Sequence, residues 1–448
     1  MRKILIVILT LFIIACDDWL DIKPKNYVAS DEVFATRENI YAALTGCYDA
    51  LQLQHYYGRS FIIAGDLLSD NSVAKGTKIE LIALDENALT PDNIVVEGIW
   101  EDIYTAVNRA NYILAGIQKV SFLNESQKND IVGQLLFLRA LHYFNLVRLY
   151  GAVPLKLFPT IKNDPTNFLP RTPVFKVYEQ ILVDLDSAEV TIQNTHPQWA
   201  TIRSVKALKA LVYLTLNDYT NALLFANACL AENSTLESDY SKLFGSYTEP
   251  SSEIIFYIPF VPSDNSRLAE YHFPNQLGGR YENAPSSYLM NLIGTGDKRE
   301  KWIAETLSTS SGTIFYAKKY PNLSTGANNV AVIRNAEVYF IRAEALYFSD
   351  SISNFSAILN DINTIRQRAG LNPVDSASVS GKLWTTLENE KQLEFAFEGK
   401  RWFDLIRTNR ALLKISTVTT VNQTLFPIPQ SEILYNPNIK PTDQNPGY

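Results

Sequence analysis

Cysteine, histidine and methionine are scarce in this chain of 448 residues, with three, four and two copies respectively. Three cysteines cannot build the disulfide framework of a small secreted domain, and a chain of this length buries a sufficient core without one. The histidines are scattered, and no HExxH motif pairs two of them. Because transition metals are usually held by clusters of histidine and cysteine, we expect neither a metal site nor a cofactor.

Positive charge and long apolar runs are also in short supply. The chain has 40 lysines and arginines against 47 aspartates and glutamates, for a net charge of -7. A nucleic-acid surface needs clustered lysine and arginine, so we expect no nucleic-acid partner. After the first fifteen residues, no segment is apolar over the ~20 residues that a membrane-spanning helix requires.

Aromatic residues, in contrast, are abundant, with 24 tyrosines, 22 phenylalanines and 6 tryptophans. A tyrosine ring is apolar and its hydroxyl is polar, so tyrosine suits both a helical core and a wet recognition surface. Composition alone leaves both roles open.

The first sixteen residues have the pattern of a secretory address. Arg2 and Lys3 precede twelve almost wholly apolar residues, 4–15. This run is too short to span a bilayer and predicts a signal peptide. It ends in Ala15 and Cys16, which resembles the lipobox of bacterial lipoproteins, where the cysteine is acylated and anchors the protein to a membrane. The alternative is an ordinary signal peptide followed by a chance cysteine.

Helical periodicity predicts a mostly α fold. Asn124, with Gln127 three residues later, predicts a capping box at the start of one helix, and Gly151 predicts its end. The predicted helices are 38–53, 97–117, 124–150, 174–193, 203–216, 219–231, 336–348, 354–368 and 383–407.

Several predicted helices form pairs joined by a short polar turn. The pair 203–216 and 219–231 resembles a tetratricopeptide (TPR) hairpin, as does the pair 336–348 and 354–368. The helix that ends at Tyr150 and the next one make a looser third pair. No strict 34-residue period holds, so we expect a helical scaffold with insertions instead of a regular solenoid.

Two long segments, 56–94 and 233–332, interrupt the helical pattern. Both lack helical periodicity and are rich in Gly, Ser, Asn and Pro. Within the second, EIIFYI at 253–258 predicts a short strand. Loops this long inside a compact domain usually carry function.

Conspicuous sequence blocks are spread along the chain, and the longest is EFAFEGKRWFDLIR at 394–407. The others include CDDWLD at 16–21, FLRALHYF at 137–144, EVYFIRAEA at 337–345, IRQRAGL at 365–371, FPIP at 426–429 and QNPGY at 444–448. In this order they resemble the SusD/RagB family of surface lipoproteins, and the resemblance covers residues 16–448.

The resemblance implies a lipid-anchored, nutrient-binding protein on the cell surface, at the outer membrane. Such proteins form the lid of a SusC-like TonB-dependent barrel and capture oligosaccharides or polysaccharides for import. The implied fold is mostly α, a TPR-like scaffold of helical hairpins with long irregular insertions and a few short strands. The predicted organisation is a signal peptide at 1–15 and a single SusD-like domain at 16–448, with the scaffold at about 30–55, 97–231 and 333–410 and ligand-binding insertions at about 56–95 and 233–332.

We predict a binding protein instead of an enzyme. Glu394 and Glu398 could be read as a glycosidase pair, but carboxylates on adjacent turns of one helix do not flank a sugar from opposite faces. Arg401 lies three residues beyond Glu398, and Asp404 three before Arg407, which predicts an ion-paired helix. A peptide-capturing lid, a TPR-type adaptor and a surface hydrolase are the alternatives to glycan binding.

Four smaller predictions concern single residues and one turn. Cys47 and Cys229 lie in helix-like segments, which favours buried free thiols over a bridge. His142, in the most apolar helix, is predicted to be a hydrogen-bonded core residue. The segment GTGDK at 294–298 lacks the Walker spacing and is predicted to be a turn. Trp402 is predicted to lie in the core.

A sugar site needs aromatic faces for the ring and polar groups for the hydroxyls, because a buried unpaired hydroxyl costs about 1–3 kcal/mol. Rings in or near the insertions are better candidates than rings in the scaffold helices, although each could instead pack inside its insertion. Polar residues of GDLLSDN at 65–71 and those around Tyr281 complete the set. The candidates are Tyr56, Tyr57, Asp66, Asp70, Asn71, Trp199, Tyr271, Arg280, Tyr281, Asn283 and Trp302.

Overall fold

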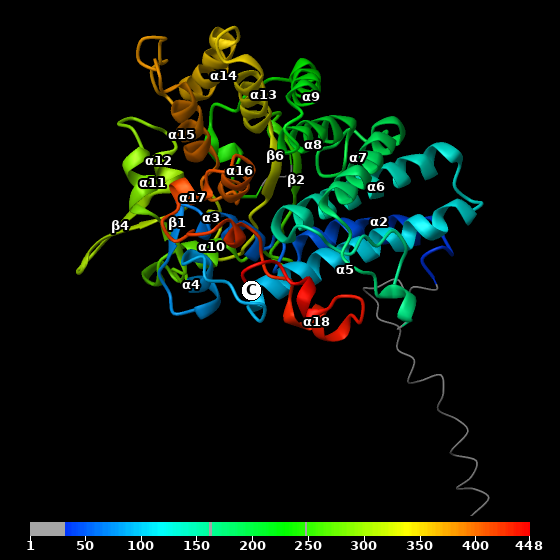
Figure 1. Cartoon of the computed structure of the whole chain (residues 1–448). Coiled ribbons are helices and arrows are strands. Elements are labelled where there is room, and N and C mark those ends of the chain that lie inside the picture. Colours follow the sequence, from blue (N-terminus) through cyan, green and yellow to red (C-terminus); the bar gives the residue numbers. More distant parts are fainter. Residues whose placement is uncertain (1–31, 161–163, 247–248) are drawn as a thin grey trace, which may run out of the picture.

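The computed structural model describes residues 32–160, 164–246 and 249–448. The predicted signal peptide, Cys16 and the acidic residues after it lie outside these ranges. The described fold is mostly α with a few short strands, as predicted (Figure 1). None of the helices in these ranges is long and apolar enough to cross a membrane.

The longer helices match the predicted segments closely, except at 383–407. They are α2 (Arg37–Asp49), α5 (Ile94–Gly116), α6 (Glu125–Tyr150), α7 (Val174–Thr191), α8 (Ile202–Thr215), α9 (Tyr219–Glu232), α13 (Asn335–Asp350), α14 (Phe355–Arg368) and α15 (Leu383–Phe395). The shorter helices are α3 (Ser60–Leu67), α4 (Ile79–Asp85), α10 (Leu268–His272), α11 (Ser287–Leu292), α12 (Glu300–Ile303), α16 (Arg401–Arg407), α17 (Ala411–Lys414) and α18 (Gln430–Tyr435).

The strands form antiparallel pairs, and β2 confirms the strand predicted at 253–258. They are β1 (Ser72–Ala74) with β3 (Asn283–Pro285), β2 (Ile254–Ile258) with β6 (Val330–Arg334), and β4 (Glu305–Thr309) with β5 (Gly312–Tyr316). Short 3₁₀ helices are η1 (Ala50–Gln52), η2 (Ile117–Lys119), η3 (Pro165–Asn167), η4 (Tyr240–Lys242), η5 (Asn275–Leu277), η6 (Val421–Thr424) and η7 (Pro441–Asp443).

Helix α6 lies at the centre of the scaffold. Its predicted capping box is present: the Asn124 side chain accepts from the Gln127 N–H at 2.9 Å, and the Gln127 side chain accepts from the Asn124 N–H at 3.2 Å. Gly151, with φ of 71°, ends the helix. His142 is fully buried in α6 and hydrogen-bonded to the Tyr56 hydroxyl at 3.1 Å, which confirms its predicted core role.

The predicted helix pairs pack as hairpins, α6 with α7, α8 with α9, and α13 with α14. Helix α13 also packs along α9, so the second and third hairpins lie side by side in Figure 1. The rings of Tyr219 and Phe348 stack across that contact with centroids 5.1 Å apart. Cys47 and Cys229 are buried free thiols, as predicted.

The first insertion contains two helices, α3 and α4, that the sequence did not predict. All eight residues of α3 are buried. A helix buried on every side has no polar face, so its sequence lacks the amphipathic period on which the prediction depended. The lack of helical periodicity in 56–94 therefore did not mean a lack of helices, and the same holds for 233–332, which contains α10, α11 and α12.

The predicted helix 383–407 is also corrected, because it breaks between α15 and α16. Phe397 and Gly399 have φ of 64° and 70° in the intervening turn. The Asp66 carboxylate of α3 accepts from the Phe397 N–H at 3.0 Å and the Gly399 N–H at 3.1 Å. Gly65 allows this close approach, since a Cβ there would lie 2.2 Å from the Gly399 carbonyl oxygen. We call residues 396–400 the family turn.

The break changes the ion pairs predicted for this segment. Glu398 does not pair with Arg401, which instead binds Asp70 at 2.8 and 3.0 Å. Asp404 and Arg407 pair at 2.8 Å as predicted. Glu394 and Glu398 instead pair with buried cations from other elements. We call this group the buried ion cluster, and its members are Glu253, Lys319, Arg334, Arg368, Glu394 and Glu398.

The buried ion cluster argues against the glycosidase reading of its two glutamates. Arg334 contacts Glu394 at 2.5 Å and Glu398 at 2.8 Å. Burial alone would raise the pKa of Glu394, but the guanidinium groups of Arg368 and Arg334 hold it well below its usual range. Both carboxylates are thus enclosed and committed to structural partners.

Candidate functional site

Two surface hollows adjoin at Asn265 in the second insertion. The first, of about 1090 Å³, lies between α2, α5 and segment 263–267, and we call it the α2–α5 hollow. The second, of about 740 Å³, lies between α10 and loop 321–326, and we call it the α10 hollow. Each is as large as a typical small-ligand pocket of ~300–1,000 Å³.

The lining of the hollows is rich in groups that can bind hydroxyls. Side chains with amide, hydroxyl or charged groups alternate with small and apolar ones. In the α2–α5 hollow they include Asp49, Gln52, Gln54, Asn108, Arg109 and Tyr112, and in the α10 hollow Ser266, Glu270, Asn322 and Thr325.

Tyr271 organises the wall between the hollows. Its ring is buried and faces the guanidinium groups of Arg59, Arg267 and Arg280 at 4.7, 5.7 and 5.7 Å from the ring centroid. Glu270 holds Arg267 with two bonds of 2.7 Å and Arg280 with one of 3.1 Å. These bonds, led by that from Arg267, lower the pKa of Glu270. The wall therefore presents positive charge in fixed positions, and the buried Tyr271 ring packs against the guanidinium groups that carry it.

Tyr281 stands next to this wall in a strained conformation. Its φ of 50° is uncommon for a residue other than glycine. Its backbone N–H donates to the Phe273 carbonyl at 2.9 Å, and its hydroxyl donates to the Phe315 carbonyl at 3.0 Å. The Tyr281 ring is half-buried, and the Phe315 side chain on β5 is exposed. The hydrogen bond between Tyr281 and Phe315 thus holds two partly exposed aromatic residues next to each other.

The sequence reasoning missed Phe315, Arg267 and Glu270. A signal for the last two was the i,i+3 spacing of opposite charges. For Phe315 it was the ring-containing run GTIFY, which begins with a turn-forming glycine and predicts a strand.

The candidates in segment 65–71 lie together, but away from both hollows. Asp66 and Asn71 are fully buried and bonded to each other at 2.8 Å. The Gln392 amide donates to Asp70 at 2.9 Å and to Asn71 at 3.0 Å. With the bond from Arg401 to Asp70, these contacts brace the family turn. Asp66 and Asn71 have no exposed surface, so the prediction that these two residues contact the ligand is corrected.

Five other candidates are enclosed in the same way, which corrects their interpretation as ligand contacts. One is Tyr271, whose buried hydroxyl accepts from Arg59 at 2.7 Å. Tyr56 and Tyr57 both accept from the Asn145 amide, at 2.7 and 3.0 Å, and pack on α6. Asn283 is fully buried against His272 at 3.1 Å. Trp302 is buried and packs against Phe244, with centroids 5.5 Å apart.

Trp199, Arg280 and Tyr281 keep part of their surface, and they remain predicted contacts. Trp199 is half-buried and meets the Tyr48 ring edge-on at 4.6 Å. It is absent from the lining of the two hollows, whereas Arg280 and Tyr281, which are neighbours in the sequence, contact residues of the α10 hollow.

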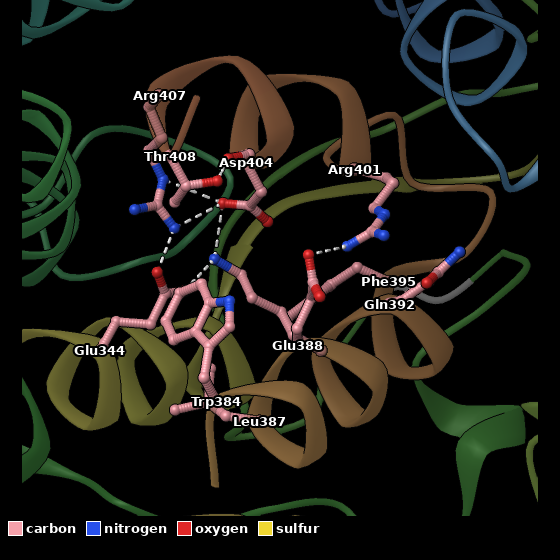
Figure 2. A pocket seen from close by; sticks show the side chains of 11 residues that line it. Glu344, Trp384, Leu387, Glu388, Gln392, Phe395, Arg401, Asp404, Arg407 and Thr408 are labelled. Atoms are coloured by element: carbon pink, nitrogen blue, oxygen red, sulfur yellow. Dashed lines mark hydrogen bonds and ion pairs between the residues drawn. The ribbon is translucent and has the colours of Figure 1, made fainter. Parts of the chain in front are cut away.

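A much smaller cavity of about 20 Å³ lies between α13, α15 and α16 (Figure 2). Figure 2 shows Arg407 reaching both Glu344 and Asp404, while Arg401 points to Glu388. Such a cavity has room for about one water molecule. Its charges hold α16 in place and leave no space for a sugar. In the described parts of the chain, no cluster of His, Cys, Asp and Glu could hold a metal ion.

Comparison with known proteins identifies the family. The sequence model described as "SusD family" matches residues 278–417, and the one described as "Starch-binding associating with outer membrane" matches residues 18–214. SusD-like protein P2 of Formosa agariphila is 25% identical, over 100% of this chain and 99% of its own length.

Solved structures share the architecture. A SusD superfamily protein from Bacteroides vulgatus superposes with a TM-score of 0.81 at 19% identity, over 92% of this chain and 99% of that one. A laminarin-binding SusD-like protein superposes with a TM-score of 0.76 at 23% identity, over 92% of this chain and 100% of that one. The fold is that of the SusD superfamily. The chain belongs to the SusD/RagB family, which confirms the resemblance seen in the ordered sequence blocks.

Proposed function

We propose that this protein is a cell-surface lipoprotein that binds oligosaccharides or polysaccharides without cleaving them. In this proposal it delivers them to a SusC-like TonB-dependent transporter in the outer membrane. The observation that carries the proposal is the pair of adjoining hollows, which are lined by hydroxyl-binding groups. Tyr281 and Phe315 add aromatic surface near them, because the Tyr281 N–H donates to the carbonyl of Phe273, a residue that lines the α10 hollow. A laminarin-binding protein with the same fold supports the ligand class.

Calorimetry on a soluble form that begins after Cys16 tests the ligand class. We expect laminarin or another polysaccharide in a panel to bind, and Phe315→Ala to weaken that binding about three- to tenfold, as the loss of one aromatic contact predicts. Tyr435→Ala is the matched control, because this ring is 76% exposed on α18, which contributes no residue to either hollow and, unlike β5, makes no hydrogen bond to Tyr281.

The outcomes separate the alternatives. Binding of peptides but of no glycan would identify a peptide-capturing lid and refute the glycan proposal. Equal weakening by Phe315→Ala and Tyr435→Ala would refute the site. Release of reducing ends from a bound polysaccharide by the purified protein would refute the absence of catalysis.

The anchor and the transporter partner are tested in cells. We expect Cys16→Ala to move the protein from the membrane fraction to the soluble fraction, and wild-type protein to co-purify with a TonB-dependent barrel. Membrane retention of the Cys16→Ala variant would contradict the lipid anchor.

A further inference from the structure

Arg148 of α6 is half-buried and has an unusual environment for a charged side chain. Its guanidinium carbon lies 3.9 Å from the Phe144 ring centroid and 4.0 Å from that of Phe403, so the group is held between two aromatic rings. Its Nε donates to the Phe144 carbonyl at 3.2 Å, and its Nη2 donates to the Asn145 side chain at 2.5 Å. Within the described residues, Nη1 has no acceptor and no carboxylate lies within 4 Å of the guanidinium nitrogens.

A cavity of about 50 Å³ adjoins Arg148, between α3, α6, α8, α16 and the family turn. Five other charged residues line it, and each has a partner of opposite charge. Lys400 binds Glu337 at 2.6 Å, Glu398 belongs to the buried ion cluster, and Asp404 binds Arg407 at 2.8 Å, as Figure 2 shows. The charge of Arg148 is therefore the unmatched one at this cavity.

A second hydrogen-bond donor faces the same cavity. Tyr57 lines it with a buried side chain, and its hydroxyl oxygen accepts from the Asn145 amide at 3.0 Å. In the described structure the Tyr57 O–H has no acceptor of its own. Asn145 thus holds Tyr57 through its amide nitrogen and Arg148 through its amide oxygen, which places the two donors at one site.

We propose that this cavity binds one small monovalent anion of the size of chloride, held by Arg148 Nη1 and the Tyr57 hydroxyl. A half-buried cation that lies between two rings without a counter-charge loses part of its hydration, and an anion here supplies the missing charge. The volume admits a monatomic anion with about one water molecule and excludes a sugar ring. Apolar neighbours such as Phe61 and Leu141 disfavour strongly hydrated, doubly charged anions.

Bromide is the probe for the first test. Crystals soaked in sodium bromide should show an anomalous peak within hydrogen-bond distance of Arg148 and Tyr57, and Arg148→Met should abolish it. Methionine keeps an unbranched apolar chain between the two rings. Absence of the peak in the wild-type protein refutes the proposal.

Thermal unfolding in solution is the second test. Replacing sodium gluconate, whose anion is too large for the cavity, by sodium chloride at equal ionic strength should raise the wild-type Tm by about 2 °C or more. Arg148→Met should remove this rise. Should that variant fail to fold, Tyr57→Phe deletes only the hydroxyl and should reduce the rise.

Arg342→Met is the matched control. Arg342 also lies near an aromatic ring, 5.2 Å from the Tyr339 centroid, but it is paired with Asp361 at 2.9 Å. Its variant should keep the full response to chloride. An equal response in wild type and Arg148→Met, or a bromide peak with no chloride effect on Tm, would mean binding at crystal concentration only and would overturn the proposal.

Discussion

Asp66 connects two segments more than 300 residues apart, and its removal should be among the most destabilising single changes in this protein. The carboxylate accepts three hydrogen bonds, from the Phe397 N–H, the Gly399 N–H and the Asn71 amide, at 2.8 to 3.1 Å. Asp66→Ala leaves two backbone N–H groups without a partner in the interior.

The size of the effect follows from those two groups. Each buried unpaired N–H costs about 1–3 kcal/mol, so Asp66→Ala should lower the free energy of unfolding by about 2–6 kcal/mol. This is a large part of the 5–15 kcal/mol that is typical of a folded domain. Asp66→Asn should cost less, because one side-chain oxygen remains to accept.

Urea unfolding followed by tryptophan fluorescence measures the change, since Trp402 lies two residues after the family turn. Burial raises the pKa of Asp66 to about 7, so the comparison belongs at about pH 8.5, where the carboxylate is ionised. The control is Asp239→Ala, which removes an exposed carboxylate that also accepts from a backbone N–H. A loss below about 1 kcal/mol for Asp66→Ala, or an equal loss for Asp239→Ala, would refute the reasoning.

Three further predictions use the same measurement. Gly65→Ala should lower the free energy of unfolding by several kcal/mol, because the new Cβ would lie 2.2 Å from a backbone oxygen. The Cβ of Gly46→Ala would have nothing within 4 Å, so this control should stabilise α2 by up to about 1 kcal/mol. A larger loss of stability for Gly46→Ala than for Gly65→Ala would contradict the packing. Glu394→Gln should cost about 3–5 kcal/mol, because it leaves buried guanidinium charge uncompensated, and a neutral result would show that the buried ion cluster does not need this charge. Burial lowers the pKa of His142 and of His272 to about 3, so the unfolded chain binds their protons first and stability falls as the pH drops from about 6.5 toward 3. Each of the two histidines should lower the free energy of unfolding by about 2 kcal/mol at pH 5 relative to pH 7.5. The His272→Gln variant should therefore lose about 2 kcal/mol less stability than the wild type over this pH range. An equal pH dependence of stability in variant and wild type would contradict this assignment.

The candidate site was predicted less well than the fold. The insertion 233–332, predicted to bind the ligand, contributes to the lining of both hollows. Arg280 and Tyr281 contact Glu270 and Phe273, which line the α10 hollow. The enclosed candidates are Tyr56, Tyr57, Asp66, Asn71, Tyr271, Asn283 and Trp302. Composition marks a ring as suitable for stacking on a sugar, but exposure depends on which segments pack over it, and those segments are distant in sequence.

The amino-acid sequence by itself determined the long amphipathic helices, the capping box at Asn124 and the order of the family blocks. These features depend on residues within a few positions of one another, so local periodicity and side-chain chemistry are enough to specify them. Only the tertiary structure decided where the helix 383–407 breaks, because the carboxylate that stabilises the family turn comes from Asp66. It also decided which aromatic rings are buried and which charge is left unmatched, at Arg148, since burial and charge balance are properties of the packed chain.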